Sequence, residues 1–448
     1  MKRYRLCPSQ CLALLAALVL LTTSLPLPAP DETAGRGVPS FRIEGIADAH
    51  AGNPFAKQQG PRVIREIRFQ GNHTTHEYIL RRELGFHEGD VYDDDALNDA
   101  WFRLEQLDFI AYVDIQVQRP EPGQVVLIIQ VEEDHRFDGR PTLRWTRRFD
   151  WMYGLTGRMI NFRGRGETLW AQMHWGHQHH YSLGWKNPWI LGGAHLGVGL
   201  SGYYERYRFV YEPFEFEDIG GTFSLWRDLL SHLRATASYT YRTTKISHSA
   251  WNDVYPEGTT DDPYIVAQLE YDSRDLRYYP SHGIDARAKA TFGAIGSGDL
   301  DAYTFYELFL SAFQEVPVLG ILAGRVSYLG ASDPLPVYER SYLGGPCDIR
   351  GVEFSSVRGD ENFLATIELR HPILMVPLRD GKAVGVGVHG FFDWGTAWEQ
   401  AQTISDADMR HAGGVGLHLN LNTYNLRFEW AFSDRDGNSF IFADTFTF

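Results

Sequence analysis

The chain is poor in cysteine, in basic residues and in long apolar runs, and each shortage excludes a class of protein. Three of its 448 residues are cysteine: Cys7, Cys11 and Cys347. The first two fall in a segment that we expect to be removed, so neither a disulfide nor a cysteine-based metal site is expected in the mature chain. Basic residues number 42 against 57 acidic ones, which disfavours a nucleic-acid partner because phosphate binding needs a basic surface. No run of about eighteen apolar residues follows residue 30, so a bundle of membrane-spanning helices is excluded.

The sequence is rich in glycine and aromatic residues, and it opens with a segment typical of export. It has 44 glycines, and 14% of its residues are aromatic, as the tight turns and aromatic girdles of a barrel wall require. Lys2, Arg3 and Arg5 precede an apolar run over residues 11–21, and small residues near Ala29 offer a cleavage site. We therefore predict a secretory signal peptide over residues 1–29, with a signal anchor as the alternative. Residues 30–61 lack periodicity and are predicted to form a flexible leader.

Residues 62–135 are predicted to form a small α+β domain. Apolar and polar residues alternate over 63–69, as in a strand that is buried on one face. Three consecutive aspartates, Asp93, Asp94 and Asp95, suit the positive end of a helix. The predicted elements are a strand over 63–69, a helix from Thr74 or Thr75 to Leu84, a helix over 93–107, and strands over 111–119 and 124–132.

From about Thr142 the chain changes to short alternating segments separated by turn residues. We count sixteen, an even number as in bacterial single-chain barrels, and predict a transmembrane antiparallel β-barrel over residues 141–448. The predicted strands are Thr142–Phe149, Met152–Phe162, Glu167–Trp175, Tyr181–Trp185, His195–Tyr203, Ile219–Trp226, Leu233–Thr243, Tyr264–Asp272, Ile284–Phe292, Tyr303–Val316, Ile321–Leu329, Asn362–Ile373, Val384–Trp398, Gly413–Leu421, Tyr424–Phe432 and Ser439–Phe448.

The connections alternate between short and long, as the two ends of an outer-membrane barrel require. Residues 163–166 and 318–320 are short turns, whereas the segments 205–218, 248–263 and 332–361 are long. By parity the last of these is the sixth outer loop. In the strand over 384–398, Asp393 shares a face with His389 and Phe391, and the opposite face is more apolar. Asp393 is therefore expected to point into a polar lumen.

Four short motifs combine glycine, arginine, aspartate and phenylalanine in ways that alternation does not explain. A single arginine among small and apolar residues needs an anion to hold it, and an Asp-x-Arg sequence before Pro and Gly favours an Asx-type turn. The motif residues are Gly344, Gly345, Arg350 and Gly351 in the sixth outer loop; Phe391, Asp393 and Gly395 on a later strand; Asp272, Arg274, Pro280 and Gly283 in a periplasmic turn; and Phe446 and Phe448 at the end.

Together these motifs resemble those of the BamA/TamA superfamily of outer-membrane assembly and translocation barrels, also called the bacterial surface antigen family. Residues 62–135 look like one copy of its periplasmic POTRA domain. The resemblance implies a location in the bacterial outer membrane, with the POTRA domain in the periplasm. Val352 departs from the pattern, because the family usually has an aromatic residue at this position.

The resemblance also implies a mechanism. Arg350 would pair with Asp393 and lock the sixth loop inside the barrel, Phe448 would act as a sorting signal, and the seam between the first and last strands would act as a lateral gate. Unfolded outer-membrane or secreted proteins would be the clients, with membrane lipid, lipopolysaccharide and periplasmic accessory proteins as further partners. A client strand would add to the edge of the POTRA sheet, where we would first probe the strand over residues 124–132.

Other readings remain open. The chain is alternatively a gated or passive pore, a structural barrel, or a two-partner secretion transporter, which usually has two POTRA domains and a plug helix. Arg350 and Asp393 are alternatively ordinary lumen charges with nearer partners. No enzyme activity and no cofactor are expected, because no Ser-His-Asp set, phosphate loop or paired carboxylates occur. A histidine cluster without nearby carboxylates, which is not expected to bind metal, comprises His174, His177, His179 and His180.

Overall fold

The computed structural model describes residues 62–443, except for 106, 147–149, 177, 192–195, 209–213, 231, 250–255, 277–278, 298–299, 378–382 and 422–423. The predicted signal peptide and leader lie outside the described residues, as do His177, Phe446 and Phe448. Among the described residues no helix has the length and apolar character needed to cross a membrane.

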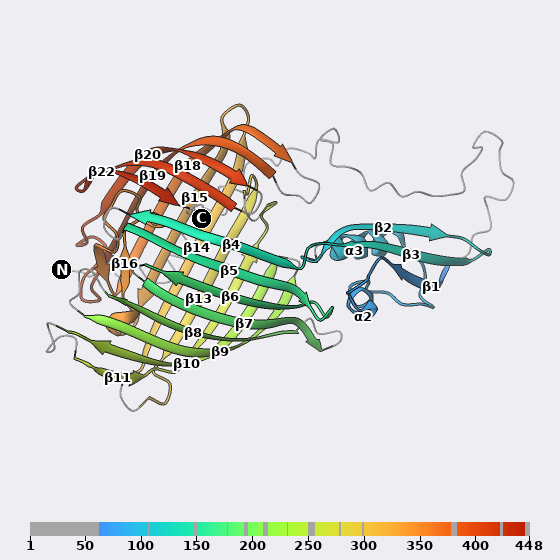
Figure 1. The fold of residues 1–448 in the computed structure, drawn as a ribbon, viewed down its shortest axis with the longest axis horizontal. Coiled ribbons are helices and arrows are strands. Elements are labelled where there is room, and N and C mark those ends of the chain that lie inside the picture. The colour runs from blue at the N-terminus through green and yellow to red at the C-terminus, as the bar shows by residue number, and fades with distance from the viewer. Residues whose placement is uncertain are drawn as a thin grey trace. The chain divides into compact units, whose positions relative to one another are not determined.

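The N-terminal unit has the predicted order of strand, two helices and two strands. Its three-stranded sheet has the order β1-β3-β2, and β1 runs parallel to β3. Buried aliphatic residues of the two helices include Ile79, Leu80 and Leu104. The elements are β1 (Val63–Gln70), α2 (Glu77–Arg81), α3 (Asp94–Glu105), β2 (Ile110–Gln118) and β3 (Gln124–Glu133), as Figure 1 shows.

The sheet order corrects our choice of the edge strand. Residues 124–132 lie in β3, which is the central strand and pairs on both sides. The start of β1 is also covered on its outer side, because Ile64 exchanges backbone hydrogen bonds with Gly89 and Asp90. Among the described residues, the two edge strands of this sheet are therefore β1, which is covered at its start, and β2. The sequence could not reveal this, since strand order in a small sheet is set by tertiary packing.

The start of α2 also differs from the prediction. Its N-cap residue is His76, and no side chain caps the helix. Thr74 and Thr75 instead donate their backbone N–H groups to the carboxylate of Glu133, over 3.1 and 2.6 Å. Partial burial opposes the charged form of Glu133, but the hydrogen bonds from the two threonines outweigh it and lower the pKa of this carboxyl below its ordinary value.

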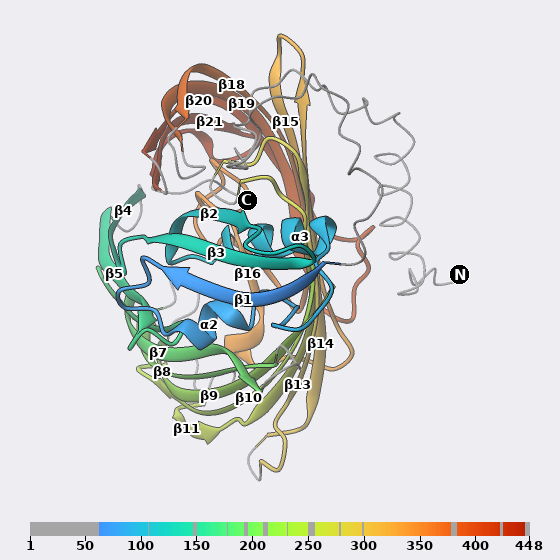
Figure 2. The ribbon, with the colours of Figure 1, turned by 90° about the vertical axis from the view of Figure 1, so that its right-hand side faces the viewer.

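Sixteen long antiparallel strands form the predicted barrel, and β11 is a short additional strand beside β10 and β12. Figure 2 shows these strands encircling the lumen. The strands are β4 (Phe137–Thr146), β5 (Asp150–Phe162), β6 (Glu167–Trp175), β7 (Gln178–Leu191), β8 (Leu196–Arg208), β9 (Glu215–Leu230), β10 (Leu233–Ser247), β11 (Gly258–Asp261), β12 (Tyr264–Asp272), β13 (Gly283–Gly293), β14 (Tyr303–Val316), β15 (Gly320–Ala331), β18 (Glu361–Pro377), β19 (Ala383–Trp398), β20 (Arg410–Leu421), β21 (Tyr424–Ser433) and β22 (Gly437–Ala443).

Several strands are longer than predicted, and the added length lies mainly where the polar pattern suggested loops. Glu205 and Asp218, predicted to bound a loop, are paired residues of β8 and β9. Cross-strand hydrogen bonds continue beyond the apolar band, and the sequence pattern does not record that extension. The sixth loop holds three short elements that we did not predict: the 3-10 helix η1 (Val337–Glu339) and the hairpin β16 (Ser341–Leu343) and β17 (Val357–Gly359).

The predicted division into outward and inward faces is confirmed. Along β19, Val388 and Phe392 are exposed, whereas His389 and Asp393 are buried. The same alternation holds on β18 and β21, whose inward faces carry charged residues. A polar lumen inside an apolar outer wall follows, as a membrane barrel requires.

The ring of strands closes where the last strand meets the first. β22 and β4 pair through a single pair of described residues, Phe442 and Trp145. By contrast, β18 and β19 are in register from Glu361↔Trp398 to Pro377↔Ala383. The residues that would continue this ladder, 147–149 and 444–448, lie outside the described residues.

Candidate functional site in the barrel lumen

The loop between β15 and β18 enters the barrel through backbone conformations that glycine adopts more readily than other residues. Gly344 and Gly351 have φ values of +114° and +87°, a region that side chains with a Cβ rarely adopt. A Cβ on Gly344 would lie 2.2 Å from the carbonyl oxygen of Glu353, and one on Gly351 would lie 2.8 Å from the Cβ of Ala431 on β21. The two glycines therefore let the loop turn tightly and approach the wall closely.

Arg350, between these turns, is fully buried and binds Asp393 of β19 in a fork. Its Nε donates to Asp393 Oδ2 over 2.8 Å, and its Nη2 donates to Oδ1 over 2.9 Å. The backbone N–H of Arg350 also donates to Oδ2, over 3.0 Å, and the guanidinium lies 3.5 Å from the ring centroid of Phe391. Such a planar, bidentate and stacked arrangement suits arginine and not lysine.

Two further carboxylates complete the surroundings of the Arg350 guanidinium. Its Nη1 donates to Glu368 of β18 over 2.6 Å and to Glu429 of β21 over 3.0 Å. Glu368 also accepts from Arg370, and Glu429 accepts from Arg427. All of these side chains have no exposed area. We call this set of three carboxylates and three guanidiniums the lumen charge cluster, and its formal charges balance.

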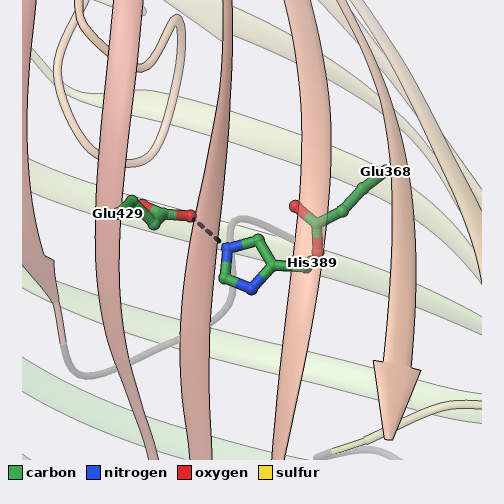
Figure 3. A group of neighbouring side chains, drawn as sticks. All are labelled: Glu368, His389 and Glu429. Carbon is green, nitrogen blue, oxygen red and sulfur yellow. Dashed lines mark hydrogen bonds and ion pairs between the residues drawn. The ribbon is translucent and has the colours of Figure 1, made fainter.

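Two glutamates of the cluster and the neighbouring His389 form a group that could in principle hold a metal ion. One ligand atom from each of Glu368, His389 and Glu429 lies within 4.8 Å of the others, and Figure 3 shows the His389 ring between the two carboxylates and bonded to Glu429. Both carboxylates already bind guanidiniums, however, and a divalent cation would add two positive charges to a balanced cluster. The residues present therefore do not fit a metal ion.

A chain of hydrogen bonds leads from the cluster toward a turn at the other end of the barrel. His389 Nε2 lies 2.9 Å from Glu429 Oε1, and His389 Nδ1 lies 3.2 Å from His418 Nδ1. His418 Nε2 lies 3.2 Å from the hydroxyl of Tyr279, a buried residue of the turn between β12 and β13. The loop and this turn are thus connected through buried polar side chains.

The loop also packs through apolar side chains. Leu343, Ile349 and Val352 form a buried cluster with Leu364 of β18 and Ala412 of β20. A Cβ on Gly395 of β19 would lie 3.2 Å from Ile349 Cδ1 and 2.7 Å from the carbonyl oxygen of Phe363. The strand glycine of the motif therefore leaves room for the loop, and Val352 is buried although it is not aromatic.

The other predicted motif residues lie apart from Arg350. Arg274 pairs with Asp272 over 2.9 Å and with Asp285 over 3.2 Å, and Gly283 has a φ of +104°. Pro280 is buried beside Tyr279 in the same turn. Arg274 thus binds both Asp272 and Asp285 at this turn.

The structure corrects one statement about the histidine cluster. We expected no nearby carboxylate, but Glu205 of β8 lies 3.5 Å from His180 Nδ1. The rings of His174 and His180 are 5.9 Å apart between centroids. Strand extension beyond the predicted ends brings Glu205 beside β7.

Sequence reasoning did not include Glu368, Glu429, Arg370, Arg427 or the two buried histidines in the candidate site. The alternation of apolar and polar residues along β18 and β21 indicates that their charged side chains face the lumen, and the sequence offers no further sign that they belong to the site. Their height along the barrel axis depends on the register between strands, and no pattern within one strand specifies it.

Comparison with known proteins agrees with this geometry. Residues 161–448, well over half of the chain, match the Omp85 superfamily domain. The chain belongs to the Omp85 superfamily. Residues 62–134 match the POTRA family described as a surface antigen variable number repeat. The barrel is therefore an outer-membrane barrel, and the N-terminal unit is a single periplasmic POTRA domain.

Two curated relatives are outer membrane protein assembly factors named BamA. That of Nitratidesulfovibrio vulgaris is 22% identical over 402 residues, which cover 84% of this chain and 49% of the relative. That of Neorickettsia risticii is 23% identical over 346 residues, which cover 71% and 46%. The chain thus spans about half the length of these relatives.

Solved structures show the same fold at low identity. BamA from Haemophilus ducreyi lacking POTRA domains 1–3 superimposes with a TM-score of 0.66 at 18% identity, covering 86% of this chain and 85% of that one. CdiB from Acinetobacter baumannii gives 0.60 at 13% identity, covering 86% and 74%. These likenesses concern the fold alone.

Proposed function

We propose that this Omp85 protein assembles or translocates other proteins at the outer membrane by capturing their strands on exposed backbone edges. Unfolded outer-membrane or secreted proteins are the clients. The observation that carries the proposal is the match of residues 161–448 to the Omp85 superfamily domain, in a closed barrel whose first and last strands, β4 and β22, meet at one seam. If this seam opens, it exposes unpaired strand edges, which are templates for further strands and which natural membrane barrels normally close. The names of the two BamA relatives support the same function.

The β2 edge of the POTRA sheet is the second proposed capture site. An extended segment gains main-chain hydrogen bonds when it adds to such an edge, and alternate side chains add specificity. Tyr112 on β2 is 51% exposed, so it is available to a client side chain. Part of this edge is already occupied, because Trp101 of α3 donates its indole N–H to the carbonyl of Val113 over 3.1 Å. A client would therefore pair mainly beyond Val113, toward Gln118.

The loop acts as a plug in this proposal. The Arg350–Asp393 pair fixes the loop against β19, and the lumen charge cluster surrounds it. The fixed loop closes the lumen while client strands are handled at the β4–β22 seam. Residues Gly344, Gly345 and Gly351 maintain the backbone path, and Phe448 serves as the sorting signal.

A gated pore is the second candidate function, because the lumen is lined with charged residues that would favour water and ions. Replacing Arg350 with alanine discriminates between the two. An assembly factor loses client handling while its barrel remains folded, whereas a pore only gains conductance.

Site-specific photocrosslinking in living cells tests the proposed function. A photoreactive amino acid replaces Gln118 on the edge strand β2, and the matched control replaces Gln130, which is also an exposed glutamine but lies on the central strand β3. We expect discrete adducts with other outer-membrane or secreted proteins at Gln118 and none at Gln130. Equal adducts at both positions, or none at Gln118 in a folded and abundant protein, would refute capture at this edge.

A further inference from the structure

The first part of the sixth loop binds the barrel wall at a second place, away from Arg350. Glu339, at the end of η1, forms an ion pair with Arg242 of β10. Both side chains are largely buried, with 17% and 8% of their area exposed. The loop is thus bound to the wall through opposite charges in a largely buried contact.

Arg242 is also held by side chains of the barrel wall itself. It pairs with Asp262, and its Nη1 lies 4.0 Å from Asp218. It also donates a hydrogen bond to the hydroxyl of Tyr303 over 3.2 Å. The guanidinium lies 4.8 Å from the ring centroid of Tyr264, which belongs to β12. Arg242 therefore keeps its position and its counter-charge even when Glu339 is absent.

Loop side chains on both sides of Glu339 pack against the same region. Tyr338 covers the Arg242 guanidinium at 4.9 Å and lies 5.9 Å from the ring of Phe216. Val337 and Tyr342 join it against Phe214 and Phe216, both almost fully buried. Earlier in the loop, Leu335 packs with Tyr303 and Phe305 of β14 and with Ala294. The contact is thus an apolar patch with a charged centre.

The two contacts lie on different parts of the barrel wall. Along the strand order, β10 is followed by β12, β13, β14, β15, β18 and β19, so Arg242 and Asp393 are six strands apart in a ring of sixteen. The contacts named above for Arg242 and for Arg350 share no residue. The loop therefore reaches from one side of the lumen to another, held at each end.

We propose that Arg242 and Glu339 form a second anchor that positions the loop independently of Arg350. The loop leaves the lumen only when both anchors release it. This inference deepens the proposed function, on whose assignment of the loop as a plug it rests. It identifies Glu339 as a positioning residue, although no sequence motif contains it.

Cys347 provides a native reporter, because it lies on the loop beside Arg350 and carries a free thiol. The purified full-length protein in lipid vesicles is treated with a membrane-impermeant maleimide, and the labelling rate of Cys347 is measured together with single-channel conductance. The variants are Glu339→Gln, which keeps the side-chain shape without the charge, Arg350→Met, and the double variant. Glu353→Gln, which alters an exposed glutamate of the same loop, is the matched control.

Independent anchors contribute additively to the free energy of loop release, so the fold-changes multiply. We expect each single variant to label Cys347 faster than wild type, and the double variant to label it faster by the product of the two factors. Conductance follows the same order, and Glu353→Gln behaves as wild type. If Glu339→Gln adds nothing to the Arg350→Met rate, or acts no more strongly than Glu353→Gln, the second anchor is refuted.

Failure of the proposed function has a different signature. In that case Gln118 gives no client adducts, whatever the labelling rates of Cys347 are. The two hypotheses are therefore tested by separate readouts on the same protein.

Discussion

Replacing Arg350 with methionine should release the sixth loop while the barrel stays folded. The substitution removes the guanidinium but retains an unbranched side chain of similar length. It leaves Asp393 without its charged partner, since the hydrogen bonds of Asp393 go to Arg350. Glu368 and Glu429 keep Arg370 and Arg427, respectively. Asp393 therefore becomes a buried carboxylate with no guanidinium hydrogen-bonded to it.

The structure sets the size of this effect. Breaking a buried ion pair from one side costs about 3–5 kcal/mol, and about 1.4 kcal/mol corresponds to a factor of ten. The equilibrium for local opening of the loop should thus rise about 10²- to 4 × 10³-fold. Amide hydrogen exchange of residues 343–352 measures this opening directly, in the full-length protein in detergent micelles.

Two controls make the result interpretable. Arg358→Ala removes an exposed arginine from the same loop and should leave exchange of residues 343–352 unchanged. Adding Asp393→Asn to Arg350→Met neutralises the orphaned carboxylate, so the double variant should exchange no faster than Arg350→Met alone. If Arg350→Met exchanges within about threefold of wild type, less than 1 kcal/mol, the reasoning from a buried charge is wrong.

Three further predictions concern the backbone at Gly351, the pH dependence of Glu133 and the hydrogen bond between Tyr279 and His418. Gly351→Ala should destabilise the loop by about 1–3 kcal/mol, because φ is +87° there, and faster exchange of residues 343–352 will show it. The pKa of Glu133 is lowered in the folded protein, so its hydrogen bonds stabilise the POTRA domain fully above the ordinary glutamate pKa of about 4.3, and this stabilisation fades as the pH falls toward the lower folded pKa. At such low pH the backbone amide of Thr75 should exchange hydrogen faster, after correction for intrinsic exchange rates. Glu133→Gln should remove this pH dependence. Tyr279→Phe should cost about 1 kcal/mol by removing the hydrogen bond to His418, measured as faster exchange in residues 275–282, and no change there would exclude that bond.

The barrel could be predicted from the sequence because lipid and lumen select residues on alternate sides of every strand. That pattern predicted the strand number, the inward direction of Asp393 and the place of the long loop. It did not give the strand ends, because polar extensions such as the paired Glu205 and Asp218 are held by backbone hydrogen bonds. It also did not give the order of strands in the POTRA sheet, where β3 and not β2 is central.

The Arg350–Asp393 pair was proposed from motifs, and the structure brings the two residues together. The wider cluster could not be proposed, because Glu368 and Glu429 are brought beside Arg350 by register across four strands. Glu339 presents the same difficulty, since its partner Arg242 is almost a hundred positions earlier in the chain. Both anchors depend on the closed ring, which a linear pattern does not describe.

A reversible covalent closure of the β4–β22 seam tests the central claim most directly. Trp145 and Phe442 are the paired residues there, and directly opposed residues of antiparallel strands lie close enough for a disulfide. Trp145→Cys and Phe442→Cys are combined with Cys347→Ser, which alone serves as the control, and the outer-membrane fraction of the native host is quantified by mass spectrometry. The account predicts that oxidation depletes client proteins and that reduction restores them. An unchanged outer-membrane composition with the disulfide fully formed would contradict it.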